Sequence, residues 1–265
     1  MKRLALLTLA LTIATSAAYA GDNDWRLRIK KEVDGWTASF SSSMDYGSGS
    51  NRVRGSGVRV ERTRALAAFT KLRIDGPIDV TLGQAGSDQA TVIADDNIEP
   101  MIETAVEGDA LVVRMKRDAS FTTRSAPHVR VQARALQAIV VDGSGDLDVD
   151  RFKADGLSLD VIGSGDVQLG EVDLQRLSVS ISGSGDVRLA GRAEQQTWAL
   201  SGSGDVDARS LSGRTAKVGI SGSGDVDLGV TEQLDVQLSG SGDLSYAGRP
   251  QLRQSVSGSG EISRR

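Results

Sequence analysis

The heptapeptide ISGSGDV at residues 181–187 is one copy of a motif that repeats through the second half of the 265-residue chain. Its core, Gly-Ser-Gly-Asp, returns at intervals of 18 to 20 residues, and Glu replaces Asp in the last copy. The copies begin at Gly143, Gly163, Gly183, Gly202, Gly222, Gly240 and Gly258. A fixed period of about 20 residues is typical of solenoids, in which each repeat forms one coil.

Apolar residues occupy fixed positions around each copy, two and four residues before the first glycine and four and six residues after it. Around Gly163 these are Leu159, Val161, Val167 and Leu169. The position four residues before the glycine is polar only in the last copy, where Gln254 stands. Such alternation predicts strands with one buried face, and the β-branched content favours strand over helix.

A third apolar column is indicated nine residues past the first glycine by Phe152, Val172 and Leu211. Each copy is therefore predicted to form two or three short strands around a bend. Stacked at roughly 4.8 Å per coil, such units form a parallel β-helix. The sequence thus predicts an all-β solenoid with coils of about 18–20 residues.

The motif itself has a structural explanation, because a β-helix must bend at the same place in every coil. Glycine supplies backbone angles that other residues reach only with strain. Serine and aspartate side chains can cap the exposed backbone groups of a bend. We therefore expect each Asp to accept hydrogen bonds from its own turn.

The pattern extends back to an earlier coil, in which Leu72, Ile74, Gly76 and Asp79 hold the offsets of the later copies. The stretch from Asp95 to Met115 breaks the period. We interpret it as a longer excursion with a turn at Gly108-Asp109 that covers one end of the helix.

The first 20 residues have the pattern of a signal peptide. Lys2 and Arg3 precede an apolar run that is shorter than the about 20 residues of a membrane span, and Ala18-Tyr19-Ala20 resembles a cleavage site. Residues 1–20 are thus expected to be removed, residues 21–51 to form a loosely ordered lead-in, and residues 52–265 to form the β-helix domain. We expect an exported protein, periplasmic or extracellular, with no membrane anchor after cleavage.

Composition excludes some classes of function. The chain has no cysteine, so its core and backbone hydrogen bonds must hold the fold. The formal net charge is −4, whereas nucleic-acid-binding domains usually carry a basic surface, so no nucleic-acid partner is expected. Basic residues do concentrate early, between Arg26 and Arg64. That segment is either a solvated face or a contact for an anionic surface.

Three ordered motifs resemble a known family. They are GSGVRVERTRALAAFTKLRIDGPIDVTL at residues 55–82, NIEPMIETAVEGDALVVRM at residues 97–115, and the serial GSGDV copies. Together they are similar to the head GIN domain over about residues 52–262. The resemblance implies a right-handed parallel β-helix, and an adhesion role of the kind assigned to the heads of autotransporter adhesins.

The acids of the repeat form a column of candidate ligands for calcium: Asp146, Asp166, Asp186, Asp205, Asp225, Asp243 and Glu261. Calcium takes six to eight oxygens, and one carboxylate per coil leaves several to be found elsewhere. The column therefore either caps the bends or binds calcium weakly. No other cofactor is indicated.

Many β-helices cleave polysaccharides, and retaining glycosidases need two carboxylates about 5 Å apart. The unbroken column singles out no such pair, however, and His128 is the only histidine. Trp198 lies in a core column and cannot serve as a sugar platform. We therefore expect a non-catalytic module for adhesion or envelope association, with a glycan or envelope component as its partner. The alternative is a carbohydrate-active β-helix enzyme, a polysaccharide lyase or hydrolase. The oligomeric state is left open.

Overall fold

The computed structural model describes residues 29–32, 35–38, 52–117 and 119–265. Strands β1 (Ile29–Glu32) and β2 (Gly35–Ala38) form an antiparallel pair within the expected lead-in. The expected signal peptide and the rest of the lead-in lie outside the described residues. Within the described ranges, no helix has the length and apolar character needed to cross a membrane.

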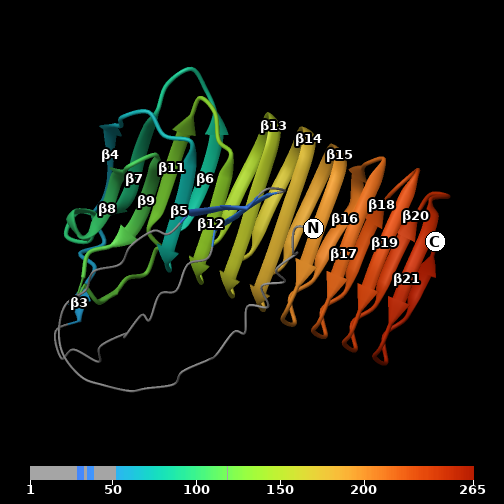
Figure 1. Ribbon diagram of the computed structural model, residues 1–265. Helices are drawn as coiled ribbons and strands as arrows, with labels where there is room; N and C mark the ends of the chain where they lie inside the picture. Colours follow the sequence, from blue (N-terminus) through green and yellow to red (C-terminus); the bar gives the residue numbers. More distant parts are fainter. Residues whose placement is uncertain (1–28, 33–34, 39–51, 118) are drawn as a thin grey trace, which may run out of the picture. The chain divides into compact units, whose positions relative to one another are not determined.

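The repeats form stacked parallel coils, as Figure 1 shows. The first ones contain β12 (Ala138–Gly143), β13 (Leu147–Gly163), β14 (Val167–Gly183) and β15 (Val187–Leu200). The later coils contribute two shorter strands each: β16 (Val206–Ser212), β17 (Thr215–Ile220), β18 (Val226–Gly229), β19 (Gln233–Leu238), β20 (Leu244–Ala247), β21 (Gln251–Val256) and β22 (Ile262–Arg264). The predicted all-β parallel β-helix is confirmed.

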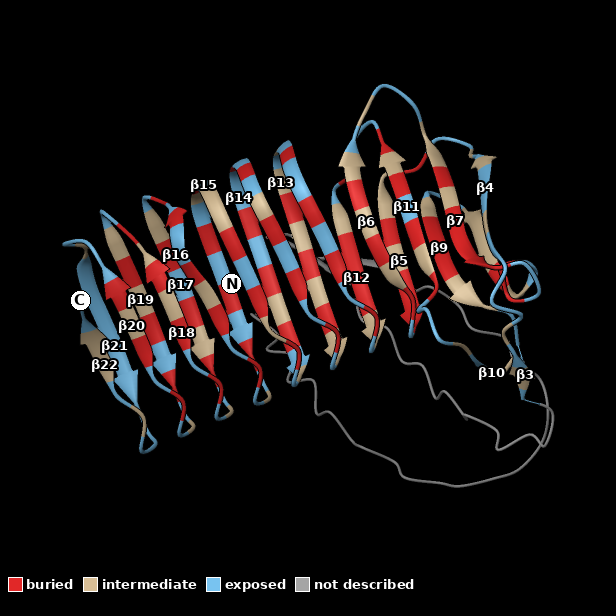
Figure 2. Cartoon of the chain, turned by 180° about the vertical axis from the view of Figure 1, so that it is seen from behind, coloured by how far each residue is buried: buried red, intermediate tan, exposed pale blue. Residues whose placement is uncertain are grey.

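The apolar columns stack in register through the core. Leu159 pairs with Val179 and Val161 with Ile181, and all four side chains are buried. Buried residues alternate with less buried ones along the strands of the stacked coils, such as β13 and β14, in Figure 2. The third column is also buried, at Phe152, Val172 and Leu211. In the coil between the last two, Gly191 takes the column position, because that coil is one residue shorter than its predecessor.

The glycines of the bends serve two needs. Gly143 and Gly163 have φ of 140° and 115°, values that side chains rarely adopt. In later coils the reason is the close approach of neighbouring coils. A Cβ on Gly202 would lie 1.9 Å from the carbonyl oxygen of Gly183. Only glycine fits such a stack.

The earlier coil predicted from the sequence is present as β5 (Lys71–Gly76) and β6 (Asp79–Gln84), which pair with β12 and β13. The order of coils departs from the order of the chain here. Strands β9 (Ala110–Met115) and β11 (His128–Ala133) stack on the other side of β5 and β6. The excursion after β6 therefore supplies a further coil.

The same excursion, together with the earlier strand β4, covers this end of the helix. Antiparallel strands β4 (Arg59–Ala65), β7 (Gln89–Asp95) and β8 (Ile102–Glu107) flank the parallel coils, and the 3₁₀ turn η1 (Glu99–Met101) joins β7 to β8. Gly108, with φ of 65°, turns the chain from β8 into β9. A small parallel pair, β3 (Val53–Arg54) with β10 (Phe121–Thr122), lies alongside.

Candidate functional site

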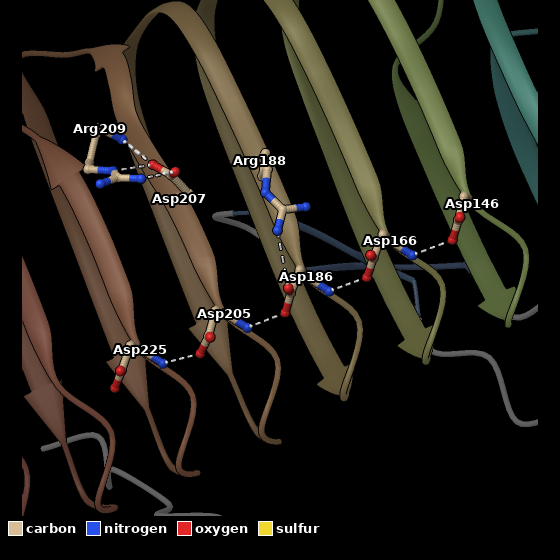
Figure 3. Close-up of polar contacts among 8 residues, drawn as sticks. All are labelled: Asp146, Asp166, Asp186, Arg188, Asp205, Asp207, Arg209 and Asp225. Atoms are coloured by element: carbon tan, nitrogen blue, oxygen red, sulfur yellow. Dashed lines mark hydrogen bonds and ion pairs between the residues drawn. The ribbon is translucent and has the colours of Figure 1, made fainter.

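The predicted acid column forms a continuous hydrogen-bonded ladder along one corner of the helix (Figure 3). The Oδ1 atom of Asp146 accepts a hydrogen bond from the backbone N–H of Asp166 at 2.9 Å, and Asp166 accepts one from Asp186 at 2.9 Å. The same bond recurs at 2.7–3.0 Å through Asp205, Asp225, Asp243 and Glu261. We call this set the carboxylate ladder.

The expectation that each Asp caps its own turn was wrong, because the donor is the amide of the next coil. The cause lies in the bend, where the parallel backbone pairing is interrupted. The N–H of Asp166 finds the carboxylate of Asp146, while its carbonyl oxygen accepts from the N–H of Leu147 at 2.9 Å. The carboxylate thus takes the place of the backbone acceptor that is missing at the turn.

Asp79 is the first member of the ladder. Its Oδ1 atom accepts a hydrogen bond of 3.2 Å from the N–H of Asp146. Asp79 was absent from the predicted column because Pro77-Ile78 replaces Ser-Gly in its coil. Its offset in the repeat was the signal that could have found it.

The ladder faces outward, as the alternation predicted. Its acids are exposed except Asp79 and Asp186, which are half-buried. Asp186 lies 3.5 Å from the guanidinium of Arg188 (Figure 3). The serines between the two glycines are exposed at the tips of the bends, for example Ser164, Ser184 and Ser203. The corner therefore presents one hydroxyl and one carboxylate per coil. Across the described ranges, no three carboxylate or histidine side chains gather closely enough to hold a metal ion.

A charged pair lies beside the ladder on the same face. Arg209 donates from Nε to Oδ1 of Asp207 at 2.8 Å, and its backbone N–H bonds to the same oxygen at 3.3 Å (Figure 3). These hydrogen bonds from Arg209 lower the pKa of Asp207 to about 2. Asp207 is thus ionised above about pH 4.

A shallow cleft lies over the third apolar column, and its lining includes Phe152, Val172 and Gly191. Two ion pairs line it: Arg151 with Glu171 at 3.0 Å, and Lys153 with Asp173 at 2.6 Å. The hydrogen bond from Lys153 lowers the pKa of Asp173. The cleft lies five to seven residues past each ladder acid and does not interrupt the ladder.

The repeat pattern did not predict two polar clusters of the structure. Gln196 faces the core, and its Oε1 accepts from Nε1 of the buried Trp198 at 3.1 Å. Arg73 bridges Asp75, at 2.6 Å, and Asp142, at 3.0 Å, and burial raises the pKa of Asp75. Nothing in the spacing of the repeat marked these residues, because each belongs to one coil only.

His128 lies at the start of β11, half-buried, with its Nε2 atom 3.0 Å from Oγ1 of Thr81. Burial lowers its pKa. Its described partner is a threonine hydroxyl, which suits a structural contact.

With the ladder and coils described, the family can be assigned. Residues 68–250 match the family model described as "Putative auto-transporter adhesin, head GIN domain". The chain belongs to the head GIN domain family. The resemblance seen in the sequence motifs is confirmed, and no curated protein matches the chain.

Several solved structures share this fold. A protein of Bacteroides fragilis NCTC 9343, described as a putative adhesin, has a TM-score of 0.74 and 24% identity, covering 80% of this chain and 100% of its own. A second, from Parabacteroides distasonis ATCC 8503, is described as a putative lipid binding protein, with a TM-score of 0.69, 24% identity and coverage of 81% and 100%. A third, a putative adhesin of Parabacteroides merdae ATCC 43184, has a TM-score of 0.67, 21% identity and coverage of 81% and 99%. At these identities the likeness shows the fold alone.

Proposed function

We propose that this head GIN domain protein is an exported, non-catalytic module that adheres to a glycan or another repetitive component of the cell envelope. The observation that carries the proposal is the corner with its carboxylate ladder, where each Gly-Ser-Gly-Asp or Gly-Ser-Gly-Glu copy presents one hydroxyl and one carboxylate. The family model and two of the solved structures are described with adhesion, which agrees with this role.

The ladder suits repetitive partners for a physical reason. The hydrogen bond to each Oδ1 holds the carboxylate in place, so little side-chain entropy is lost when a ligand binds. Sugar hydroxyls donate to carboxylates and exchange hydrogen bonds with serine hydroxyls. Individually weak contacts, repeated at the coil spacing, add up to firm attachment through multivalency.

The charges of the cleft argue against catalysis there. A glycosidase needs one carboxylic acid that keeps its proton near neutral pH. Glu171 and Asp173 each form an ion pair with a basic side chain, and the pKa of Asp173 is lowered rather than raised. In the ladder, each acid from Asp79 to Asp243 accepts the same backbone hydrogen bond, so none of these is set apart as an acid or a base.

The proposal is tested by co-sedimentation of the full chain with purified peptidoglycan and with envelope polysaccharide. Replacing Ser164, Ser184 and Ser203 together by Ala removes three hydroxyls of the corner and leaves the backbone bonds intact. We expect affinity to fall at least about tenfold, since each lost hydrogen bond is worth about 0.5–1.5 kcal/mol. The matched control removes the two positive charges of the cleft by combining Arg151→Gln with Lys153→Gln. This variant should bind as the unaltered chain does.

If the serine variant binds as well as the unaltered chain, the corner is not the binding surface. The supernatants are also assayed for new reducing ends and for unsaturated sugars. Time-dependent release of either product by the unaltered chain would support the carbohydrate-active enzyme instead.

A further inference from the structure

The two ends of the β-helix are finished differently. At the β4 end, antiparallel strands cover the coils, and Ile98 and Ile102 are buried. At the other end all six residues of β21 are exposed. Leu252 and Val256, 36% and 45% exposed, continue columns whose preceding members, Leu234 and Leu238, are buried. The apolar core therefore reaches the surface at β21.

The backbone of β21 is also open on this side. The N–H groups of Gln251 and Ser257 donate to the preceding coil, at 2.8 Å each. Because successive residues of a strand direct their N–H and C=O groups to opposite sides, Leu252, Gln254 and Val256 direct theirs to the open side. An apolar edge strand of this kind is a template for pairing with another strand.

The sequence of β21 is complementary to itself in antiparallel pairing centred on Gln254. In that register, Leu252 lies opposite Val256 of the partner subunit, so the two apolar side chains cover each other. Gln254 lies opposite Gln254 of the partner subunit, and the two amides can hydrogen-bond to each other. Arg253 lies opposite Ser255 of the partner subunit, so no like charges meet. Gln254, the one polar residue of the core column, thus lies on the two-fold axis that would relate the two copies.

Strand β22 fits the same axis. Centred on Ser263, antiparallel pairing places Glu261 opposite Arg265 of the partner subunit, and the reverse, which joins opposite charges twice. Arg265 is already oriented by an ion pair with Asp227 at 3.0 Å. Gln254 lies five residues before the turn tip at Ser259, and Ser263 lies four after it. The two strand centres therefore lie across the core from each other, and one two-fold axis can pass through both.

We propose that β21 and β22 form a homodimer interface, in which two copies of the chain join end to end with antiparallel strands. Such an interface is isologous and closes after two copies, so it does not lead to fibres. The joined β-helices would double the number of ladder rungs in one particle. The interface stands independently of the adhesion proposal, because it uses different residues.

The test begins with sedimentation velocity of the full chain over a range of concentrations, where we expect twice the chain mass of 27.9 kDa. Gln254→Pro removes an N–H that points to the partner and leaves the bonds to the preceding coil, and proline is tolerated on edge strands. This variant should be monomeric where the unaltered chain is dimeric, with an unchanged circular dichroism spectrum.

A second measurement reads the register directly. The chain has no cysteine, so Gln254→Cys can form a disulfide only between copies. Directly opposed residues of a hydrogen-bonded antiparallel pair have Cα atoms about 5.5 Å apart, within the range of a disulfide. We expect Gln254→Cys to cross-link quantitatively on mild oxidation and the off-axis control Val256→Cys to stay largely uncross-linked.

A monomeric unaltered chain at every concentration would overturn the proposal, as would equal cross-linking of the two cysteine variants. Particles that grow beyond two copies would also overturn it, since they would show head-to-tail association.

Discussion

The Oδ1 atom of Asp205 accepts a hydrogen bond of 2.8 Å from the backbone N–H of Asp225, one coil further along the helix. The acid is thus a part of the backbone hydrogen bonding. Two carboxylates about 5 Å apart repel by roughly 0.8 kcal/mol in water. A hydrogen bond to a charged group contributes about 1.5–3 kcal/mol. The bond exceeds the repulsion, so the row of like charges is stable.

Substitutions at Asp205 separate these two effects. Asn keeps an oxygen acceptor for the amide of Asp225 and removes one charge, so Asp205→Asn should leave the free energy of unfolding unchanged or slightly higher. Asp205→Ala leaves that amide without its acceptor and should lower it by about 1 kcal/mol. Urea unfolding of both variants measures the difference. A loss as large for Asn as for Ala would mean that the charge, and not the acceptor, stabilises the corner.

The stacked glycines should tolerate no side chain. Gly202→Ala places a Cβ 1.9 Å from a backbone oxygen, and neither coil can move without disturbing its neighbours. We expect a loss of about 3 kcal/mol or more, at the upper end of the range for overpacking. Gly219→Ala is the matched control, because its nearest atom, the carbonyl oxygen of Trp198, would lie at 3.9 Å. Thermal melting should separate the two variants, and similar melting temperatures would contradict the steric account.

The fold was predictable because one physical requirement recurs in every coil. Columns such as Leu159, Val179 and Val218 show in the sequence since each coil must bury the same positions. The outward direction of the ladder followed from the same alternation. The head GIN motifs before the repeat pointed to the same fold.

What the sequence did not reveal depends on contacts that occur once. The coil formed by β9 and β11 stacks on the far side of β5 and β6, although it lies between β6 and β12 in the sequence. The repeat pattern does not show this change of order. The partner of each ladder acid was also missed, because a single copy of the motif does not show which coil supplies the donor. Gly191 replaces a core residue only because its coil is one residue short.

Gln196 is predicted to be needed for Trp198. Gln196→Leu would leave the indole N–H buried without its partner, at a cost of about 1–3 kcal/mol in the free energy of unfolding. Trp198→Phe removes the N–H, so adding Gln196→Leu to it should cost clearly less. Denaturant unfolding of the two single variants and the double variant gives the coupling energy. Additive losses would show that the hydrogen bond contributes nothing.

Asp207 should contribute to the loss of stability in acid. Its pKa of about 2 in the folded protein lies below the ordinary 3.8, so its stabilisation is complete above pH 4 and disappears as the pH falls through 2. The side chain is 36% exposed, and screening by solvent keeps the effect below about 1 kcal/mol. Asp207→Asn should flatten the dependence of the free energy of unfolding on pH between 4 and 2, and Arg209→Gln should do the same. If both variants keep the pH dependence of the unaltered chain, the pair of Asp207 and Arg209 does not contribute to the loss of stability in acid.

Calcium should leave the melting temperature of the full chain almost unchanged. One oxygen of each ladder carboxylate before Glu261 already accepts from a backbone amide, as at Asp186 and Asp205, and calcium needs six to eight oxygens. Melting is measured with calcium and then with a chelator. A clear rise with calcium would contradict this expectation, and the double variant Asp186→Asn with Asp205→Asn then locates the ion. If that variant loses the rise, the ladder binds calcium. If it keeps the rise, the ion lies elsewhere, and the ladder acids serve only as acceptors for the backbone amides of neighbouring coils.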